Sequence, residues 1–331
     1  MIYIEPDSKD AAFHFSVEEY IVRHYPWHEP VLLIWQADKC AMIGSNQIAE
    51  AEIDMSYAKQ NEIQIVRRSS GGGTIYTDMG TLLYTMILPR TKKQAPLELA
   101  REKVATPIAK ALNSLGVPAK IEGRNDILVD GKKVSGLAQY ARYERICTHG
   151  SLLYDADLET IANLLRVDED KIRSKALKSV RSRVTNIREY MSPQCSTEEF
   201  WMLLKRELFS QLKVTEHSLT EHDIDQISEI CHRKYGADTW NFRQPAKFSF
   251  RNSKRFTGGK VEVYLDVDKG IVTSCSIRGD FLGVLPIRGL EKALENKLFQ
   301  HSAFDEAITA VSVQSYLGLV TKDEFLSCMF N

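Results

Sequence analysis

A run of three glycines behind two arginines and two serines is the part of this sequence most suited to binding an anion. Residues 65–77 read IVRRSSGGGTIYT, with apolar sequence on both sides. Glycine lets a backbone approach a ligand closely, and successive N–H groups can converge on phosphate oxygens. Arg67 and Arg68 add forked donors that suit phosphate or carboxylate. The segment is either an anion-binding loop or a flexible hairpin with exposed arginines.

The glycine run does not match the two common nucleotide-binding motifs. A P-loop requires a lysine and then a serine or threonine after its last glycine, but Gly73 is followed by Thr74 and Ile75. The dinucleotide fingerprint begun at Gly71 requires glycine where Tyr76 stands. Alternate strand residues point to opposite faces, so we expect only one of the two arginines to face a ligand.

Lys133 is a second candidate, in the segment NDILVDGKKVSGLA at 125–138. Its Asp-Gly dipeptide predicts a hairpin with a two-residue turn. If Val134 is buried, alternation places Lys133 and Ser135 on the open face, beside Gly136. The alternative is an ordinary solvated lysine pair.

Two further segments contain residues that could do chemistry. His149 and Gly150 precede a strand-like run in THGSLLYDADL, and such a histidine is either structural or catalytic. The segment KIRSKALKSVRSRVTNIR at 171–188 is strongly basic. It could be a solvated helix face, a nucleic-acid patch or a contact for an anionic substrate.

Alternating strand-like and helix-like segments must position these residues. We predict strands at 31–35, 40–45, 62–66 and 81–88, a hairpin at 125–138, and helices at 96–116, 153–167 and 196–212. Pro107 predicts a kink or a late start in the first helix. The pattern indicates a mixed α/β or α+β fold.

The C-terminal third has a different composition. The polar segment 236–256 is typical of a linker. Beyond it, the alternation of Val261, Val263, Leu265 and Val267 before a turn at 268–270 predicts a half-exposed hairpin. Helical segments follow at about 286–300 and 303–328, which together predict a small second domain.

Composition excludes several classes of protein. The 331 residues are 44% hydrophobic and carry a formal net charge of −1, so no global field favours nucleic acid or an anionic membrane. No apolar run is long enough for a membrane helix, and the N-terminus does not resemble a signal peptide. The six scattered cysteines favour reduced thiols in a cytoplasm.

Five segments together resemble the lipoate–protein ligase A family in order and spacing. They are RRSSGGGTIYTDMGT, GRNDILVDGKKVSGLA, THGSLLYDADL, SVRSRVTNI and, at that family's junction into its C-terminal domain, WNFRQPAKFSFRNSKRF. The resemblance implies the fold of biotin and lipoate ligases and of class II tRNA synthetase cores. We therefore expect an adenylating catalytic domain with a mixed α+β sheet over residues 1–245. A small α+β accessory domain would occupy residues 246–331.

The resemblance also implies an activity that depends on ATP and Mg²⁺. Lipoate would be joined to AMP with release of pyrophosphate, and the lipoyl group would then pass to one lysine of an acceptor protein. The implied acceptors are lipoyl domains of 2-oxo acid dehydrogenase acyltransferase subunits and the glycine-cleavage H protein. We expect a cytoplasmic monomer with no nucleic-acid or membrane partner.

The same resemblance assigns roles to individual residues. The implied ATP-binding residues are Arg68, Gly71, Gly72, Gly73, Thr74, Ile75, Tyr76 and Lys133. Lys133 is also the implied catalytic residue, because it would touch both the lipoate carboxyl and the α-phosphate. Lipoate would contact Ser70, Gly72, Lys133 and His149, and a loop with Ser179, Arg181 and Arg183 would shield the adenylate from water.

Some assignments stay open at the level of the sequence. Asn125 and Asp126 could hold Mg²⁺, or Asp126 could cap the hairpin. Thr77-Asp78 and Gly80-Thr81 stand where many family members have His-Asp and Gly-Asn, which puts a role for these side chains in doubt.

Three alternative functions remain. Octanoyl- and lipoyl-transferases share the implied fold and use a cysteine nucleophile, for which Cys147 is the candidate. A nucleic-acid-binding protein could use the basic segment at 171–188, although that segment lacks interleaved aromatics. A biotin-type ligase would need a glycine-arginine-glycine motif that this sequence lacks.

Overall fold

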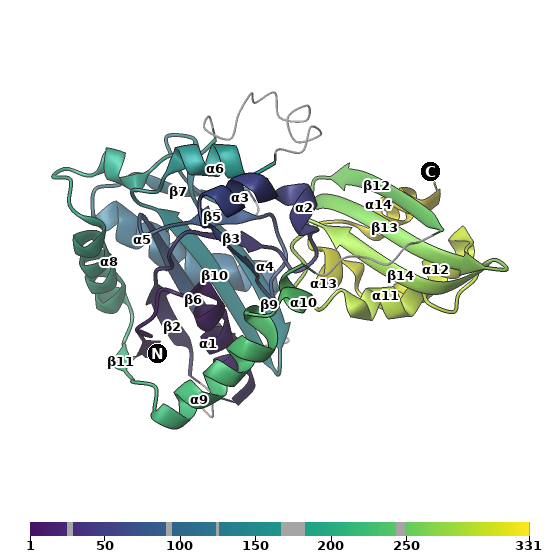
Figure 1. Cartoon of the computed structure of the whole chain (residues 1–331), viewed down its shortest axis with the longest axis horizontal. Coiled ribbons are helices and arrows are strands. Elements are labelled where there is room, and N and C mark those ends of the chain that lie inside the picture. The colour runs from purple at the N-terminus through teal and green to yellow at the C-terminus, as the bar shows by residue number, and fades with distance from the viewer. Residues whose placement is uncertain (25–28, 91–94, 124–125, 167–182, 243–248, 331) are drawn as a thin grey trace.

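The main sheet has eight strands (Figure 1). The computed structural model describes residues 1–24, 29–90, 95–123, 126–166, 183–242 and 249–330. The strand order is β11 (Thr215–Glu216), β1 (Ile2–Ile4), β2 (Val31–Trp35), β6 (Thr81–Pro89), β10 (Arg145–Leu153), β9 (Lys132–Arg142), β8 (Asp126–Val129) and β7 (Ala119–Glu122). Strand β1 runs parallel to β11 and β2, and the pairs from β2 to β7 are antiparallel.

A second, three-stranded sheet holds the glycine run. Its central strand β3 (Cys40–Ile43) lies between β4 (Gln64–Arg67), which is parallel to it, and β5 (Ile75–Thr77), which is antiparallel. Residues 68–74 connect the two outer strands. The strand predicted before the glycines is confirmed as β4, but the strand directly after them is the short β5, and the one predicted at 81–88 is β6 of the main sheet. A buried cluster joins this sheet to α2 (Ala49–Glu52), α3 (Met55–Gln60) and α6 (Leu158–Leu164).

Helices cover both faces of the main sheet. Helix α1 (Ala11–His24) packs on one face together with α9 (Glu221–Ile230) and the π-helical turn η3 (Cys231–Tyr235). Helices α5 (Thr106–Ser114) and α8 (Thr197–Gln211) pack on the other. Leu33 and Ile34 belong to different buried clusters, as strand alternation requires.

The helix predicted at 96–116 is interrupted, as its proline suggests. It consists of α4 (Pro96–Ala100), the π-helical turn η1 (Arg101–Ala105) and α5, which begins next to Pro107. The Thr106 N–H donates to the carbonyl of Arg101, five residues earlier. The segment is helical from Pro96 onward, so the helix does not start late; its irregularity is the π-helical turn just before Pro107. In contrast, only Leu158–Leu164 of the predicted helix at 153–167 is helical, and it begins at an Asp157 cap.

The predicted hairpin at 125–138 is confirmed as β8 and β9, with positive φ at Asp130 and Gly131. The prediction that Lys133 and Ser135 share the open face of this hairpin is wrong. A register shift opposite Ile127 and Leu128 breaks the alternation of β9, so Ser135 is buried beside Val134. Its hydroxyl lies 2.9 Å from that of Tyr84 instead of sharing the open face with Lys133.

The C-terminal part has its own core, built on a three-stranded sheet. Strands β12 (Phe250–Phe256), β13 (Gly259–Asp268) and β14 (Ile271–Gly279) pack against α11 (Arg288–Leu294), α12 (His301–Thr309), α13 (Val313–Leu317) and α14 (Lys322–Phe330). The linker prediction is wrong for β12, which pairs with β13 along its whole length. The two helical segments are four helices. A bulge near Asp266 makes Val272 buried and leaves Ile271 exposed.

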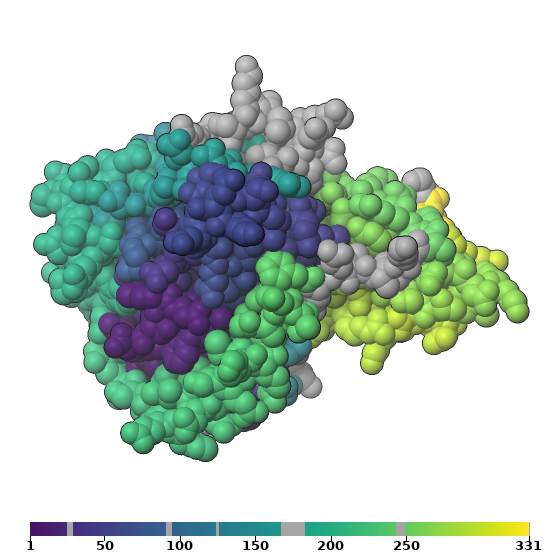
Figure 2. Space-filling view, viewed as in Figure 1, coloured from purple at the N-terminus to yellow at the C-terminus, as the bar shows by residue number. Residues whose placement is uncertain are grey.

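The two parts of the chain are in contact, as the space-filling view also shows (Figure 2). Residues 279–284 supply the backbone contacts: the Gly279 N–H donates to Asn46, and the carbonyls of Phe281 and Val284 accept from the N–H groups of Gly72 and Ala141. Among the described residues, no helix is long and apolar enough to cross a membrane.

Candidate functional site

Arg68 shapes the glycine run from within. Its guanidinium is buried and donates to the carbonyls of Met42 (2.7 Å), Gly71 (2.9 Å) and Gly73 (2.7 Å), and its Nε donates to Ser70 Oγ (3.0 Å). Burial lowers the pKa of Arg68 to about 10, so the group stays charged at neutral pH. Its donors are therefore directed at the loop's own backbone.

Arg67 points to the opposite side, as alternation predicts. Its buried guanidinium donates to carbonyls of Gly44, Gln47 and Asn241, and the Asn241 side chain accepts from the Arg67 N–H. Arg67 thus ties the glycine run to α10 (Asp238–Asn241).

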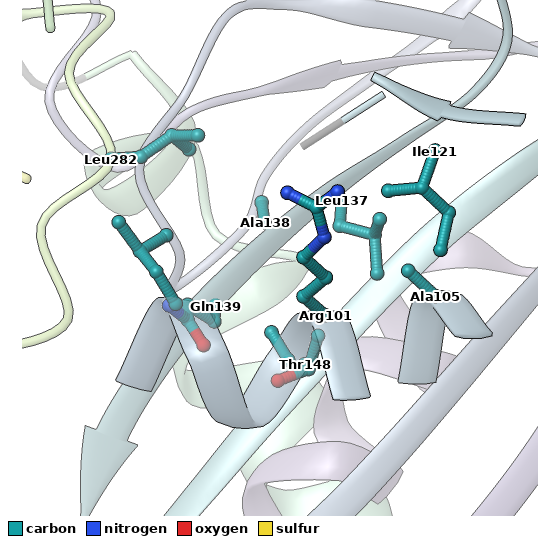
Figure 3. Close-up of a pocket in the computed structure, with 10 residues that line it drawn as sticks. Arg101, Ala105, Ile121, Leu137, Ala138, Gln139, Thr148 and Leu282 are labelled. Carbon is teal, nitrogen blue, oxygen red and sulfur yellow. The ribbon is translucent and has the colours of Figure 1, made fainter. Parts of the chain in front are cut away.

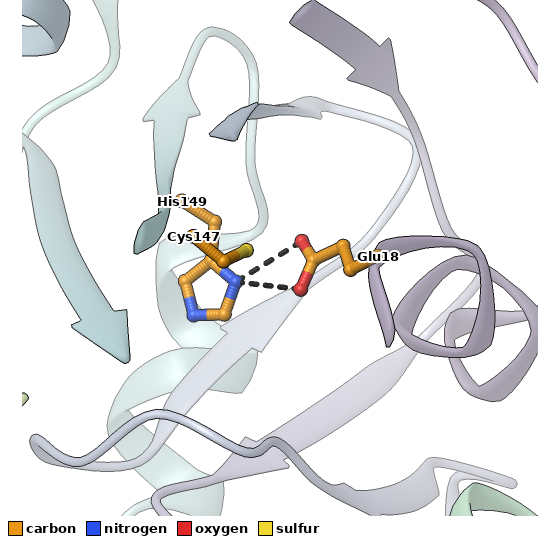
Figure 4. A group of neighbouring side chains, drawn as sticks. All are labelled: Glu18, Cys147 and His149. Carbon is orange, nitrogen blue, oxygen red and sulfur yellow. Dashed lines mark hydrogen bonds and ion pairs between the residues drawn. The ribbon is translucent and has the colours of Figure 1, made fainter. Parts of the chain in front are cut away.

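Ser70 begins a buried chain of hydrogen bonds that ends on α1. Its Oγ lies 2.6 Å from His149 Nε2, and His149 Nδ1 lies 3.0 Å from both carboxylate oxygens of Glu18 (Figure 4). Ser70 Oγ also accepts from Arg68 Nε, and the Glu18 carboxylate accepts from His149 Nδ1. Ser70 and Glu18 are at most 1% exposed and His149 is 7% exposed.

The chain continues from Glu18 into the core below the sheet. The Thr85 hydroxyl donates to Glu18 Oε1 at 2.6 Å, and Trp35 Nε1 donates to Thr85 Oγ1 at 3.2 Å. A charged arginine at one end and an indole at the other are therefore connected through four buried side chains, so His149 is held in one orientation.

Cys147 lies beside this chain, but it has the wrong environment for a nucleophile. Its side chain is fully buried. Burial raises the pKa of the Cys147 thiol well above its usual range, and the nearby charge of Glu18 adds to the effect. A reactive cysteine requires the thiolate, which is scarce here at neutral pH. The structure therefore does not favour Cys147 as an acyl carrier.

Among the described residues, the ligand atoms of Glu18, Cys147 and His149 lie close enough together to hold a metal ion. The donor set does not fit one, because Glu18 and His149 are already bonded to Thr85 and Ser70, and Cys147 is a buried thiol. The group is explained by the hydrogen-bond chain.

Lys133 lies at the open end of β9. Its side chain is 37% exposed, and Nζ lies 2.7 Å from a carboxylate oxygen of Asp126. A Cβ added at Gly136 would be 2.6 Å from this Nζ, so the lysine side chain lies directly over the glycine. The Lys133 N–H donates to the Arg183 carbonyl, and its own carbonyl accepts from Thr185. The segment predicted as the adenylate loop thus adjoins Lys133 at Arg183, while Ser179, Arg181 and Asn125 lie outside the described residues.

Gly136, Ala138 and Tyr140 share the face of β9 that leads from Lys133 to the buried chain. Ala138 pairs with His149 on β10 and lies within 4 Å of where a Gly72 Cβ would be. Two residues along a strand span about 7 Å. The structure therefore brings Lys133, the glycine run and His149 together on one surface.

The backbone of the glycine run is engaged by the C-terminal part. Gly72, at φ +92°, donates its N–H to the Phe281 carbonyl at 3.0 Å, and a Cβ at Gly71 would lie 2.6 Å from that oxygen. A Cβ at Gly73 would meet nothing within 4 Å. Thr74 donates to Gln47, Ile75 is half-buried, and the Tyr76 ring is buried in the cluster behind the small sheet.

Residues 77–78 and 80–81, where this sequence departs from the family pattern, form a turn. Asp78 accepts from the N–H groups of Gly80 and Asp157, and a Cβ at Gly80 would lie 2.0 Å from the Asp155 carbonyl oxygen. Asp78 and Gly80 are therefore explained by local structure, and Thr81 is buried at the start of β6.

The sequence reasoning missed Glu18 and its neighbour Glu19. Glu19 accepts from Tyr235 at 2.7 Å and pairs with Lys234, and both of these partners are bonded to Ser69. Consecutive glutamates thus support consecutive serines of the loop. Two adjacent acids inside the apolar segment FHFSVEEYIV were a signal that could have identified them.

Two family models match this chain. The lipoyl protein ligase A/B catalytic domain matches residues 10–209, and the bacterial lipoate protein ligase C-terminus matches residues 245–329. The lipoate-protein ligase LplJ of Bacillus subtilis is 37% identical over the full length of both chains. Lipoate–protein ligase 1 of Staphylococcus aureus is 33% identical over 97% of each.

Solved structures share the fold. A Plasmodium falciparum LipL1 structure in complex with lipoate has a TM-score of 0.79 at 20% identity and covers 98% of each chain. A lipoate-protein ligase A structure bound with ATP has a TM-score of 0.62 at 24% identity, covering 73% of this chain and 97% of its own. A third structure belongs to a lipoylation system of Thermoplasma acidophilum, described as a bipartite lipoate protein ligase and its E2 lipoyl domain. It has a TM-score of 0.65 at 26% identity and covers 75% of this chain and 98% of its own. The chain belongs to the lipoate–protein ligase family, has that family's fold and is an enzyme of this class.

Proposed function

We propose that this enzyme works in two steps with an acyl-adenylate between them. A lipoate carboxylate oxygen attacks the α-phosphorus of ATP, the bond to the β-phosphate breaks, and pyrophosphate leaves. The amine of an acceptor lysine then attacks the lipoyl carbonyl, AMP leaves with the bonding electrons, and the amine loses a proton. The names of the relatives, and the similar structures in complex with lipoate and bound with ATP, support both substrates.

The position of Lys133 is the observation that carries this proposal. It is a partly exposed cation that lies over Gly136, at the end of the surface formed by the glycine run and β9. The first step brings a carboxylate against a triphosphate, so a fixed positive charge at the reacting atoms lowers the barrier most. Lys133 would contact both the lipoate carboxyl and the α-phosphate, exchanging Asp126 for these anions.

The glycine run would lie along the nucleotide, with Arg68 as a positioning residue. Arg68 is committed to carbonyls of the loop, so it holds Gly71–Gly73 in shape and supplies a buried positive charge. Thr74, Ile75 and Tyr76 would border the adenosine through their backbone. Because the Gly72 N–H now bonds to Phe281, nucleotide binding there requires residues 279–284 to move away.

The lipoyl chain would extend from Lys133 across Gly72 towards Ser70 and His149. On this face β9 contributes Gly136 and Ala138, whose small side chains leave room for a ligand, and the Ser70–His149–Glu18 chain lies at its far end. A polar group held in one orientation gives orientation and specificity to a mostly apolar ligand.

Mg²⁺ is a further proposal, and the residues present fit it. Mg²⁺ at nucleotide sites is held by one or two carboxylates, substrate phosphates and water. Asp126, beside Lys133, supplies such a carboxylate, with Asn125 next to it in sequence. When bound, the ion would neutralise phosphate charge.

We also propose five further properties of this enzyme. They are the domain boundaries at 245 and 246, shielding of the adenylate by residues around Ser179, Arg181 and Arg183, the lipoyl-domain and H-protein acceptors, the monomeric state and the cytoplasmic setting. The Thermoplasma ligase, which is described together with its E2 lipoyl domain, supports the class of acceptor.

The test is lipoate-dependent exchange of labelled pyrophosphate into ATP, measured with no acceptor present. An adenylating enzyme catalyses this exchange with lipoate and ATP alone. Transfer from an acyl-thioester without exchange would contradict the proposal and support a transferase.

A further inference from the structure

A cavity lies between α4, η1 and the strands β9 and β10. Its empty space, counting the open solvent at its mouth, is about 400 Å³. Gln139 and Thr148 pair across β9 and β10, and the strands direct their side chains away from the face that holds His149, while Ala138 of that face borders the cavity. Leu97, Ile121 and Leu137 give it apolar walls, and Leu282 of the C-terminal part closes one side (Figure 3).

Two polar side chains in the wall of this cavity have no hydrogen-bond partner among the residues that the structure describes. Gln139 is 3% exposed and Thr148 is fully buried. Gln139 Oε1, Gln139 Nε2 and Thr148 Oγ1 are all without a hydrogen bond. Buried polar groups are bonded in native proteins, so three adjacent exceptions at the wall of a cavity indicate that something else supplies their partners.

The cavity also has a cationic side chain above it. Arg101 is exposed, and Figure 3 shows its guanidinium extended over the apolar walls. It forms no ion pair with any residue in the described part of the chain. Arg101 is the first residue of the π-helical turn η1, and such turns are frequent at functional sites.

We propose that this cavity is a second ligand site, for a short-chain carboxylic acid. The hydrocarbon chain packs on Leu97, Ile121 and Leu137, while Gln139 and Thr148 hydrogen-bond the carboxyl group and Arg101 supplies the opposite charge. A free fatty acid and a short acyl substrate share this chemistry, so both are candidates for the natural ligand.

The position of Leu282 gives this site a consequence for the catalytic one. Leu282 adjoins Phe281, whose carbonyl accepts from Gly72, and the nearby Val284 carbonyl accepts from Ala141 of β9. We call the arrangement in which residues 279–284 contact the glycine run and β9 the docked one. An acid that contacts Leu282 binds this arrangement more tightly than one in which these residues have moved away, so it shifts the population towards docking. This effect rests on the proposed function: docking occupies the Gly72 N–H, so the acid raises the apparent KM for ATP, and ATP weakens acid binding by the same factor.

The binding test uses hexanoate, with hexanamide as the uncharged comparison. Calorimetric titration of the full chain without ATP is expected to show hexanoate binding that Thr148→Val and Gln139→Met each weaken at least tenfold. Ala100→Leu, which fills the cavity from α4, should abolish it. His149→Gln, on the opposite face, should change it less than twofold, and thermal denaturation checks that each variant is folded.

Three outcomes would overturn the site. They are no heat of binding at millimolar hexanoate, which would mean that water fills the cavity; binding unaffected by the three cavity variants; and binding lost in His149→Gln, which would place the acid at the catalytic site. The same titrations with lipoate in place of hexanoate distinguish the two candidate ligands, a free fatty acid and a short acyl substrate.

The coupling has its own readout. With hexanoate present, the KM for ATP in pyrophosphate exchange should rise at least threefold in the unmodified chain and stay constant in Ala100→Leu. Binding without this rise would overturn the coupling while leaving the site intact. If exchange itself is absent, the proposed function fails but the binding result still stands.

Discussion

Ser70 Oγ lies 2.6 Å from His149 Nε2, and this short contact joins the glycine run to the main sheet. Behind it, Glu18 accepts from both His149 and Thr85. The arrangement resembles a serine–histidine–carboxylate triad in its connections. However, Ser70 is fully buried and also accepts from Arg68, so the chain orients the wall of a binding site instead of producing a nucleophile.

Glu18→Gln tests this chain. The amide of glutamine replaces an acceptor oxygen with a donor, so one buried group loses its partner and His149 loses the acceptor that orients its ring. We expect the free energy of unfolding to fall by about 1–3 kcal/mol, with a rise in the KM for lipoate. Urea denaturation and exchange kinetics measure the two effects. Glu19→Gln is the matched control: it should destabilise the fold through Lys234 and leave the lipoate KM unchanged. Equal effects of both variants on KM would count against the chain.

Lys133→Ala should lower the rate of lipoate-dependent pyrophosphate exchange by roughly 10²–10³, the cost of losing one preorganised charge. Circular dichroism and thermal denaturation should show an intact fold, because the side chain is partly exposed. Lys132→Ala, in the neighbouring residue before the bulge, is the matched control and should keep normal exchange. Near-normal exchange in Lys133→Ala would remove its catalytic role.

Gly71→Ala and Gly73→Ala compare two adjacent glycines. A methyl group at Gly71 would clash with the Phe281 carbonyl at 2.6 Å, whereas one at Gly73 meets nothing within 4 Å. We expect Gly71→Ala to cost about 1–3 kcal/mol of unfolding free energy and to speed hydrogen exchange at the Gly72 N–H. Gly73→Ala should stay within about 0.5 kcal/mol. Identical behaviour of the two variants would show that residues 279–284 do not dock on the loop in solution.

Because His14 is buried, we predict that the folded protein loses stability in acid. His14 stacks on Trp35 with ring centroids 4.3 Å apart, and its Nε2 lies 2.8 Å from the Ser8 carbonyl oxygen. Burial lowers the pKa of His14 to about 4 from 6.5. Between these values the unfolded chain binds a proton that the folded chain does not, so stability falls as pH drops from 6.5 to about 4. The total reaches roughly 3 kcal/mol.

Denaturation midpoints across this pH range measure the effect. His14→Gln keeps a donor for the Ser8 carbonyl and should flatten the profile. His24→Gln, at the exposed end of the same helix, should leave its slope unchanged. A slope that is the same in all three proteins would exclude His14 as its source.

Cys147→Ser addresses the transferase alternative. The buried thiol is not a nucleophile here, so the variant should keep at least half of the ligase activity on an acceptor domain, with ATP still required. Exclusive use of an octanoyl-thioester donor by the unmodified chain, abolished in Cys147→Ser, would contradict this account.

The sequence predicted features set by local chemistry. The Asp130-Gly131 turn determines the hairpin that presents Lys133, Pro107 determines where α5 begins, and alternation separates Arg67 from Arg68. In each case the residue itself imposes the geometry.

Features that depend on distant partners were not predictable. The bulge that buries Ser135 depends on the register of β8 against β9, and β12 is a strand although its residues 251–254 are exposed, polar side chains. Glu18 became part of the site only because α1 packs over β10, 131 residues away in sequence from His149. The occupation of the Gly72 N–H by Phe281 likewise required the position of the C-terminal part.

The most direct measurement is the intact mass of an apo lipoyl domain after incubation with this protein, lipoate and Mg²⁺, with and without ATP. The account predicts one lipoyl mass increment on the acceptor lysine only when ATP is present, and none with Lys133→Ala over the same interval. A lipoyl increment without ATP, or an undiminished one with Lys133→Ala, would contradict it.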